Sequence, residues 1–157
     1  MDSRARWTAV GIAGVAMALL GNLPLVNLVN CILCLWVWLG GALAVILYRR
    51  AQPGATLTAG QGAGLGAMAG LVGALLGAVV YFLTASISAP IMEGLMRTFN
   101  MNLPTPIAAQ DPASAIGGTL AFLVLDLILY PGFGALGGLI TANMGQPKVA
   151  DPTAPKP

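Results

Sequence analysis

The stretch GAGLGAMAGLVGALLGAVVYFL, residues 62–83, decides the fold that we expect for this chain. It holds no charged residue, and the uncharged stretch around it extends from residue 51 to residue 92. A helix needs roughly 20 apolar residues to cross a bilayer. Because lipid offers the backbone no hydrogen-bonding partner, such a segment spans the membrane as an α-helix. We therefore predict a spanning helix over about residues 62–86.

Two further apolar stretches flank this segment. Residues 7–48 hold no charged residue, and residues 112–147 hold only Asp126. Pro24 divides the first stretch, because proline lacks an amide hydrogen and disfavours helix in the residue before it. The sequence thus predicts an all-α, polytopic membrane protein, one transmembrane domain over residues 1–145. Its compact bundle of four transmembrane helices spans about residues 7–23, 28–48, 62–86 and 115–141.

The remaining segments do not have the composition of spanning helices. In residues 90–103 apolar side chains recur at three- and four-residue spacing, while Glu93 and Arg97 lie four apart on another face. This pattern predicts an amphipathic helix that lies in the interface on the outer face of the cytoplasmic membrane. We expect Pro90 to separate this helix from the preceding span. The tail, residues 146–157, is rich in proline and is predicted to be a disordered cytoplasmic segment.

The positions of the basic residues predict the orientation in the membrane. With four spans, only Arg97 lies on one side, and the other side holds Arg4, Arg6, Arg49, Arg50, Lys148 and Lys156. The basic side of a membrane protein is cytoplasmic. We therefore expect a multi-pass protein of the cytoplasmic membrane with both termini in the cytoplasm. The first apolar run also resembles a signal peptide, but it continues past Leu23, so we expect a retained anchor.

Composition excludes several classes of function. Of 157 residues, 57% are hydrophobic and 8% are charged, whereas about a quarter are charged in a soluble domain. A net charge of +2 without a basic stripe argues against a nucleic-acid partner. The chain has no histidine, nucleotide loop, zinc motif or hydrolase motif. We therefore expect no enzyme activity, no cofactor and no metal site.

Glycine recurs along the third predicted span. Gly62, Gly66 and Gly70 repeat every four residues, and Gly73 and Gly77 continue the run. Small residues let helix backbones approach closely in lipid, where burial of leucine between helices contributes little. Such a glycine zipper forms either an oligomer or pore of several copies or the internal contacts of one unit. Because the other spans also carry glycine and alanine, internal packing is favoured.

Asp126 is the one charged residue within a predicted span. It lies about ten residues into the fourth span, followed one turn later by Tyr130 and by Pro131. Charged residues inside a membrane are costly and commonly mark ion or proton pathways. Proline at 131 also frees the carbonyl of Leu127 from its helical hydrogen bond. The group is either an ion or proton site or a hydrogen-bonded packing contact between helices.

Cys31 and Cys34 form a C-x-x-C motif within NCILC, predicted on one face of the second span near its outer end. Here the chain resembles quinone-linked membrane thiol oxidases, which have four spans, internal termini and a cysteine pair at this place. The resemblance implies a redox pair at Cys31 and Cys34. It also implies a second pair before the fourth span, but residues 87–114 contain no cysteine. The alternative is that both are small buried apolar residues.

In its glycine-rich segment the chain is also similar to small bacterial inner-membrane proteins whose function is not known. Three hypotheses remain open. The first is a structural or accessory subunit, or an assembly factor, of a membrane complex, with the bilayer, other membrane subunits or a second copy as partners. The second is a small transporter or channel that uses Asp126. The third is a thiol-disulfide oxidoreductase that uses Cys31 and Cys34.

Overall fold

The computed structural model describes residues 1–23, 34–100 and 112–144, and within these ranges the chain forms α-helices and no β-strand. The all-α class predicted from the sequence is therefore confirmed. The first predicted span, residues 7–23, falls largely within the first helix. The described helices are α1 (Ser3–Asn22), α3 (Leu35–Ala51), α4 (Ala59–Thr98) and α5 (Pro112–Met144).

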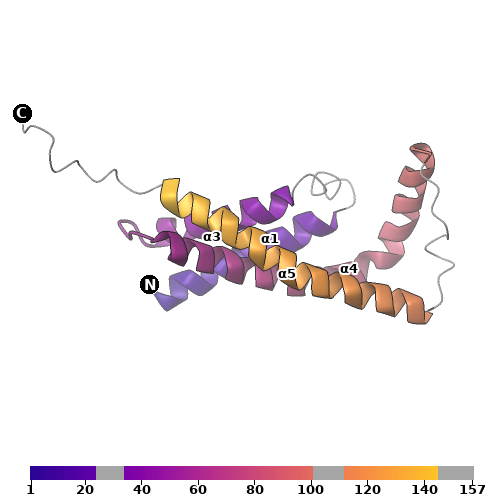
Figure 1. Cartoon of the computed structure of the whole chain (residues 1–157), viewed down its shortest axis with the longest axis horizontal. Helices are drawn as coiled ribbons and strands as arrows, with labels where there is room; N and C mark the ends of the chain where they lie inside the picture. Colours follow the sequence, from indigo (N-terminus) through magenta and orange to yellow (C-terminus); the bar gives the residue numbers. More distant parts are fainter. Residues whose placement is uncertain (24–33, 101–111, 145–157) are drawn as a thin grey trace, which may run out of the picture.

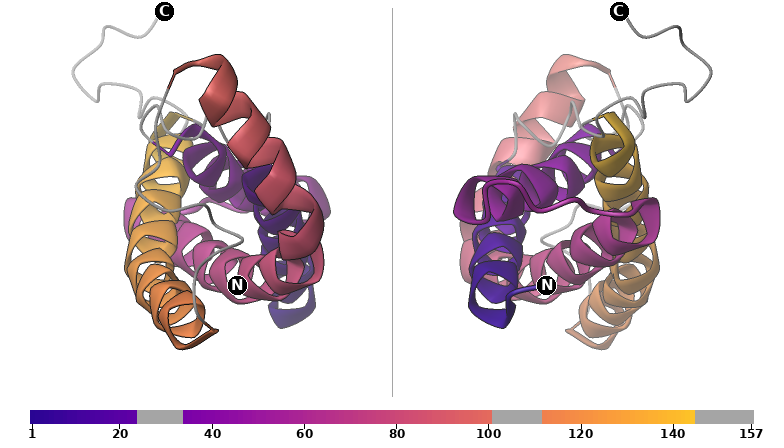
Figure 2. Two further views of the ribbon diagram at one scale, coloured as in Figure 1. Left: turned by 90° about the vertical axis from the view of Figure 1, so that its right-hand side faces the viewer. Right: turned by 90° about the vertical axis from the view of Figure 1, so that its left-hand side faces the viewer.

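The helices lie side by side and alternate in direction. Helix α4 contacts α1, α3 and α5, and α3 also contacts α1 and α5. The beginning of α1 and the end of α5 lie at the same end of the assembly, the left-hand end in Figure 1. Seen along its length, the assembly has α1 and α5 on opposite sides (Figure 2). Its core consists of small and aliphatic side chains, among them Val10, Met17, Val37, Ala44, Leu65 and Ala69.

Two of the described helices contain a segment long and apolar enough to cross a membrane. These segments are Ala59–Thr84 in α4 and Leu120–Met144 in α5. Helix α3 has 17 described residues, and α1 carries Arg4 and Arg6 in its first turn. Residues 24–33, which hold the start of the second predicted span, lie outside the described residues. Length and composition therefore mark two helices as compatible with membrane insertion, where the sequence predicted four.

The predicted break between the third span and the amphipathic segment is wrong. Helix α4 continues without interruption from Ala59 to Thr98 and contains Pro90. Its C-terminal part, shown in salmon, changes direction and stands away from the other helices (Figure 1). Proline removes one helical hydrogen bond, and sharp kinks are almost always found at such residues. The sequence rule therefore located a bend rather than a helix end, and residues 101–103 of the predicted segment lie outside the description.

Polar groups at one end of the assembly satisfy the helix termini. The Asp2 side chain accepts a hydrogen bond from the Ala5 amide at 2.8 Å and caps α1. Thr58 and Gln61 form a reciprocal capping box at the start of α4. Arg49 donates from Nη1 to the Thr141 carbonyl at 3.0 Å and from Nη2 to the Ala142 carbonyl at 2.7 Å. A cation at this position also complements the negative end of the α5 dipole.

Candidate functional site

The first three glycines of the predicted packing face lie against α5. A Cβ atom placed on Gly66 would overlap the carbonyl oxygen of Gly134, and one placed on Gly62 would overlap that of Gly138. Gly70 lies in the same way against the peptide bond that joins Tyr130 to Pro131. The two backbones are thus in direct contact over two turns, which adds many short-range dispersion contacts.

The other two glycines of the predicted face lie against α1. A Cβ atom on Gly73 would lie 3.0 Å from the Cβ atom of Met17, and one on Gly77 would lie 3.3 Å from Nδ2 of Asn22. By contrast, Gly64 has no such neighbour within 4 Å. The structure thus places all five glycines, Gly62, Gly66, Gly70, Gly73 and Gly77, against helices of the same chain.

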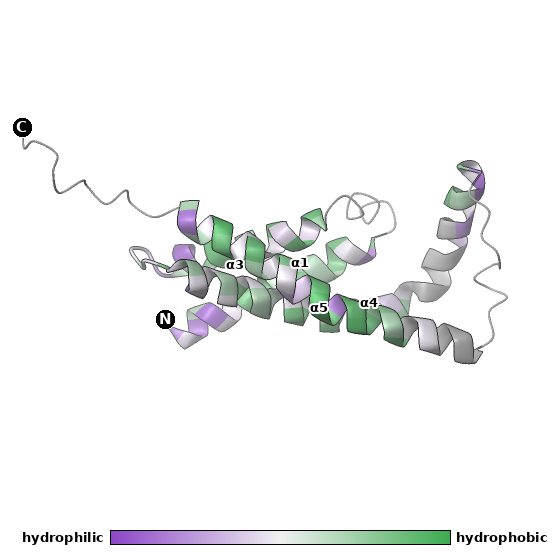
Figure 3. Cartoon of the chain, in the orientation of Figure 1, coloured by the Kyte–Doolittle hydropathy of each residue, from purple (hydrophilic) through white to green (hydrophobic). Residues whose placement is uncertain are grey.

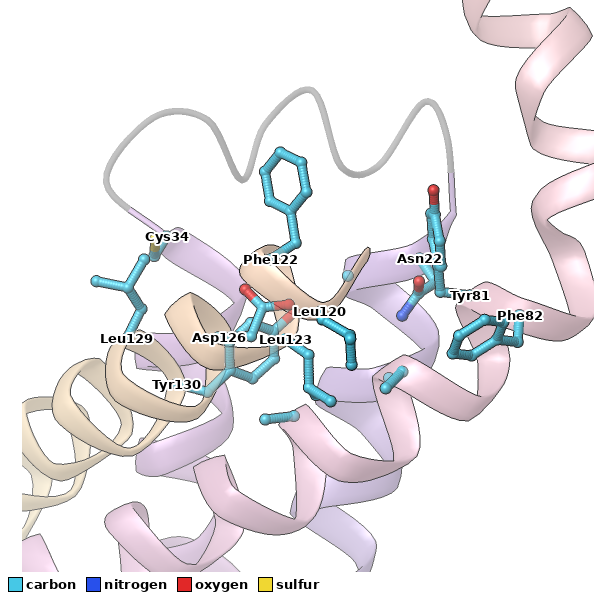
Figure 4. Close-up of a pocket in the computed structure, with 14 residues that line it drawn as sticks. Asn22, Cys34, Tyr81, Phe82, Leu120, Phe122, Leu123, Asp126, Leu129 and Tyr130 are labelled. Atoms are coloured by element: carbon cyan, nitrogen blue, oxygen red, sulfur yellow. The ribbon is translucent and has the colours of Figure 1, made fainter. Parts of the chain in front are cut away.

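A cavity of about 340 Å³ lies beyond these contacts, at the end of the assembly opposite Arg49. Its wall is formed by residues in or next to each of the four described helices. Asn22 ends α1, Cys34 precedes α3, Tyr81 belongs to α4, and Asp126 and Tyr130 belong to α5. Figure 4 shows Asn22 and Asp126 on opposite sides of this space, with Tyr130 next to Asp126. The structure therefore brings Asp126 and Tyr130 to the same cavity, and Tyr130 also packs against Gly70 and Gly21.

Asp126 is half-buried in this cavity, and its carboxyl makes no hydrogen bond or ion pair with the side chains that the structure describes. Asn22 donates from Nδ2 to the Ala18 carbonyl at 2.8 Å, which leaves its own carbonyl oxygen as an acceptor. Tyr130 is 9% exposed, and a Cβ atom on Gly21 would lie 2.6 Å from its hydroxyl. The Tyr130 hydroxyl of α5 thus lies against α1 at Gly21, while Asn22 and Asp126 line opposite sides of the cavity.

Comparison with protein families, with curated proteins and with solved structures found no match. The candidate site therefore rests on the geometry of the described residues alone.

Asp126 lies within the candidate span Leu120–Met144 of α5, and α5 itself begins earlier, at Pro112. A charged residue inside a spanning helix is costly, and such residues commonly face a cavity or the interior of the bundle.

The cysteine motif is only partly described. Cys34 lines the cavity, but it is not part of a helix face as predicted, because it precedes α3 with a left-handed φ of 52°. Cys31 lies outside the described residues. The thiol-disulfide hypothesis stays a prediction that alkylation of both thiols under oxidising conditions would test. No group of three or more His, Cys, Asp or Glu able to hold a metal occurs among the described residues.

Sequence reasoning missed two polar residues with defined roles. Asn22, near the end of the first predicted span, was not considered as a site residue, yet it lines the cavity opposite Asp126. Arg49 was counted only for membrane orientation, yet it joins α3 to the end of α5. A sequence signal exists for Asn22, since an amide side chain is uncommon in an apolar run of this length. No local signal indicates which carbonyl groups Arg49 would reach.

Proposed function

We propose that this chain is a four-span protein of the bacterial inner membrane that acts as a small transporter or channel, with Asp126 as its cation or proton site. Both termini then lie in the cytoplasm. The carrying observation is the cavity at Asp126, because ionisable residues in spanning helices that face a cavity commonly mark substrate or ion pathways.

The packing of α1 and α3 against α4 supports the proposal that these two helices also span the membrane, which gives four spans in place of two. Helices α1 and α3 lie along α4 rather than apart from it, and both expose apolar side chains outward, among them Ile12, Leu19, Leu39 and Ile46. On α5, Val124 is 59% exposed and Ile128 66% exposed. Figure 3 shows that hydrophobic residues occur along all of these helices. An apolar exterior of this extent fits lipid better than water.

The positions of the charges support the proposed orientation. Arg4, Arg6, Arg49 and Arg50 belong to the beginning of α1 and the end of α3, which lie at the end of the assembly opposite the cavity. The positive-inside rule assigns this end to the cytoplasm. The cavity would then open towards the outer side of the membrane, and the glycine zipper would be internal to one chain.

The alternative role of Asp126, as a polar contact that joins helices, has less support. A packing role requires a hydrogen-bonding partner on a neighbouring helix, worth on average about 0.6 kcal/mol in a membrane protein. None of the described residues donates such a bond to its carboxyl. A binding or pathway role requires access for a ligand, which a cavity provides.

Flux measurements in proteoliposomes test this function. The wild-type protein is expected to carry a pH- or cation-dependent flux that Asp126→Asn reduces at least tenfold, since the amide keeps the shape but removes the charge. Glu93→Gln is the matched control, because Glu93 does not line the cavity. Equal flux in wild type and Asp126→Asn would exclude the proposal.

A second candidate, an accessory subunit or assembly factor, is favoured by the C-terminal part of α4. This part stands away from the other helices (Figure 1), and Ile91 and Phe99 are exposed on it. Such a segment could dock on another membrane subunit or on a second copy. Purification in a mild detergent is expected to retain that partner. A monomer without any co-purifying protein would contradict this role.

A further inference from the structure

The wall of the cavity combines one acidic group with several aromatic rings. Asp126 is the one carboxylate among the described residues that line it. Tyr81, Phe82, Phe122 and Tyr130 contribute aromatic rings, and Leu120, Leu123 and Leu129 contribute aliphatic surface. Figure 4 shows Phe122, Leu123 and Tyr130 near Asp126 on α5, and Tyr81 and Phe82 of α4 across the space from it. The site is therefore mostly apolar, with a single negative charge.

A bare metal cation is poorly matched to this wall. Hard cations such as Ca²⁺ require six to eight oxygen ligands, and Mg²⁺ requires near-octahedral oxygen coordination. The oxygens that line the cavity are the Asp126 carboxyl and the Tyr130 hydroxyl of α5, the Asn22 amide of α1 and the Tyr81 hydroxyl of α4. They do not form the cluster of carboxylates that would replace a hydration shell. An inorganic ion at this place would have to keep most of its water.

An organic cation is matched by the same wall. Aromatic faces attract ammonium groups, especially when these are shielded from water, and the apolar side chains offer surface for a hydrocarbon or aromatic body. The volume of about 340 Å³ falls within the range of small-molecule sites. We infer that the cavity at Asp126 binds a monovalent organic cation that carries an apolar or aromatic group. This inference rests on the proposed function, in which Asp126 is the cation site.

Three probe compounds separate the contributions of charge and apolar surface. Benzyltrimethylammonium has both a fixed charge and a ring, tetramethylammonium lacks the ring, and neopentylbenzene is its neutral isostere. Binding to the full chain in nanodiscs of zwitterionic lipid is measured by equilibrium dialysis. Benzyltrimethylammonium is expected to bind at least about tenfold more tightly than either of the other two, because only it meets both the carboxylate and the rings.

Matched variants assign the binding to this cavity. Asp126→Asn is expected to lower the affinity for benzyltrimethylammonium at least about tenfold, and Phe122→Leu is expected to lower it several-fold. Glu93→Gln, outside the cavity, is expected to leave it unchanged. Circular dichroism and elution volume identify any variant that fails to fold. Because Phe122 is an exposed side chain, Phe122→Leu remains informative if Asp126→Asn does not fold.

The results distinguish the inference from the proposed function. Equal affinity for the neutral isostere, or an affinity unchanged in Asp126→Asn, would overturn the inference. The same holds if no saturable binding of benzyltrimethylammonium occurs although proton or inorganic-cation flux depends on Asp126, in which case the proposed function stands. Binding that depends on Asp126 without any flux would support the inference and exclude transport.

Discussion

The two ends of the interface between α4 and α5 differ sharply. At one end Gly62 and Gly66 of α4 lie directly on Gly138 and Gly134 of α5, and the backbones touch. At the other end α4 still offers Ala74, Gly77 and Ala78, but α5 presents Leu123, Asp126 and Tyr130, and a cavity remains. The backbone contact continues as far as Gly70, which lies against the peptide bond between Tyr130 and Pro131. Beyond it the facing side chains of α5 are large or charged, and small residues of α4 form part of the cavity wall.

The largest expected effect is that of adding a methyl group where the backbones of α4 and α5 touch, at Gly62 and Gly66, which we call the closed end of the interface. Gly66→Ala is expected to destabilise the protein by about 1–3 kcal/mol, because its Cβ atom would overlap the Gly134 carbonyl and force two backbones apart. Gly64→Ala is the control on the same helix, since nothing lies within 4 Å of its Cβ position. Chemical unfolding in mild detergent, followed by circular dichroism, measures both. Equal stability of the two variants would show that α4 and α5 do not touch at Gly66.

The closed end could be predicted from the sequence better than the cavity. The four-residue repeat of Gly62, Gly66 and Gly70 places these residues on one helix face, and this periodicity can be read directly. Asp126 was also evident as the one charge in residues 112–147. The cavity around it was not, because it depends on how α1, α4 and α5 diverge beyond their glycine contacts. No local pattern relates Asn22 to a residue more than a hundred positions later.

A single-residue rule also failed. Pro90 was expected to separate two helical segments, but α4 contains it and continues to Thr98, because a proline can kink a helix without ending it. Among the described residues only segments of α4 and α5 are long and apolar enough to cross a membrane, although α1 and α3 share a core with α4.

A smaller effect is expected at the polar contact of the closed end. Arg49→Ala removes two hydrogen bonds to the last turn of α5, and we expect a loss of about 1–2 kcal/mol, as for other partly buried hydrogen bonds from a charged donor. Arg50→Ala is the matched control, because Arg50 is exposed and its removal changes the charge at the membrane surface equally. The same unfolding measurement applies. If both variants lose the same stability, surface charge rather than the contact with α5 is responsible.

The smallest effect, and the one of opposite sign, is expected at the cavity. Asp126→Leu removes a carboxylate that no described residue stabilises by a hydrogen bond, and it adds apolar surface to the wall. We expect a gain of about 0.5–1 kcal/mol in the same assay, in line with functional sites whose residues cost stability. A loss of stability would instead identify Asp126 as a packing residue with a partner on another helix. A gain in stability combined with a loss of flux would mean that the Asp126 carboxylate is retained for function although it lowers the stability of the helix assembly.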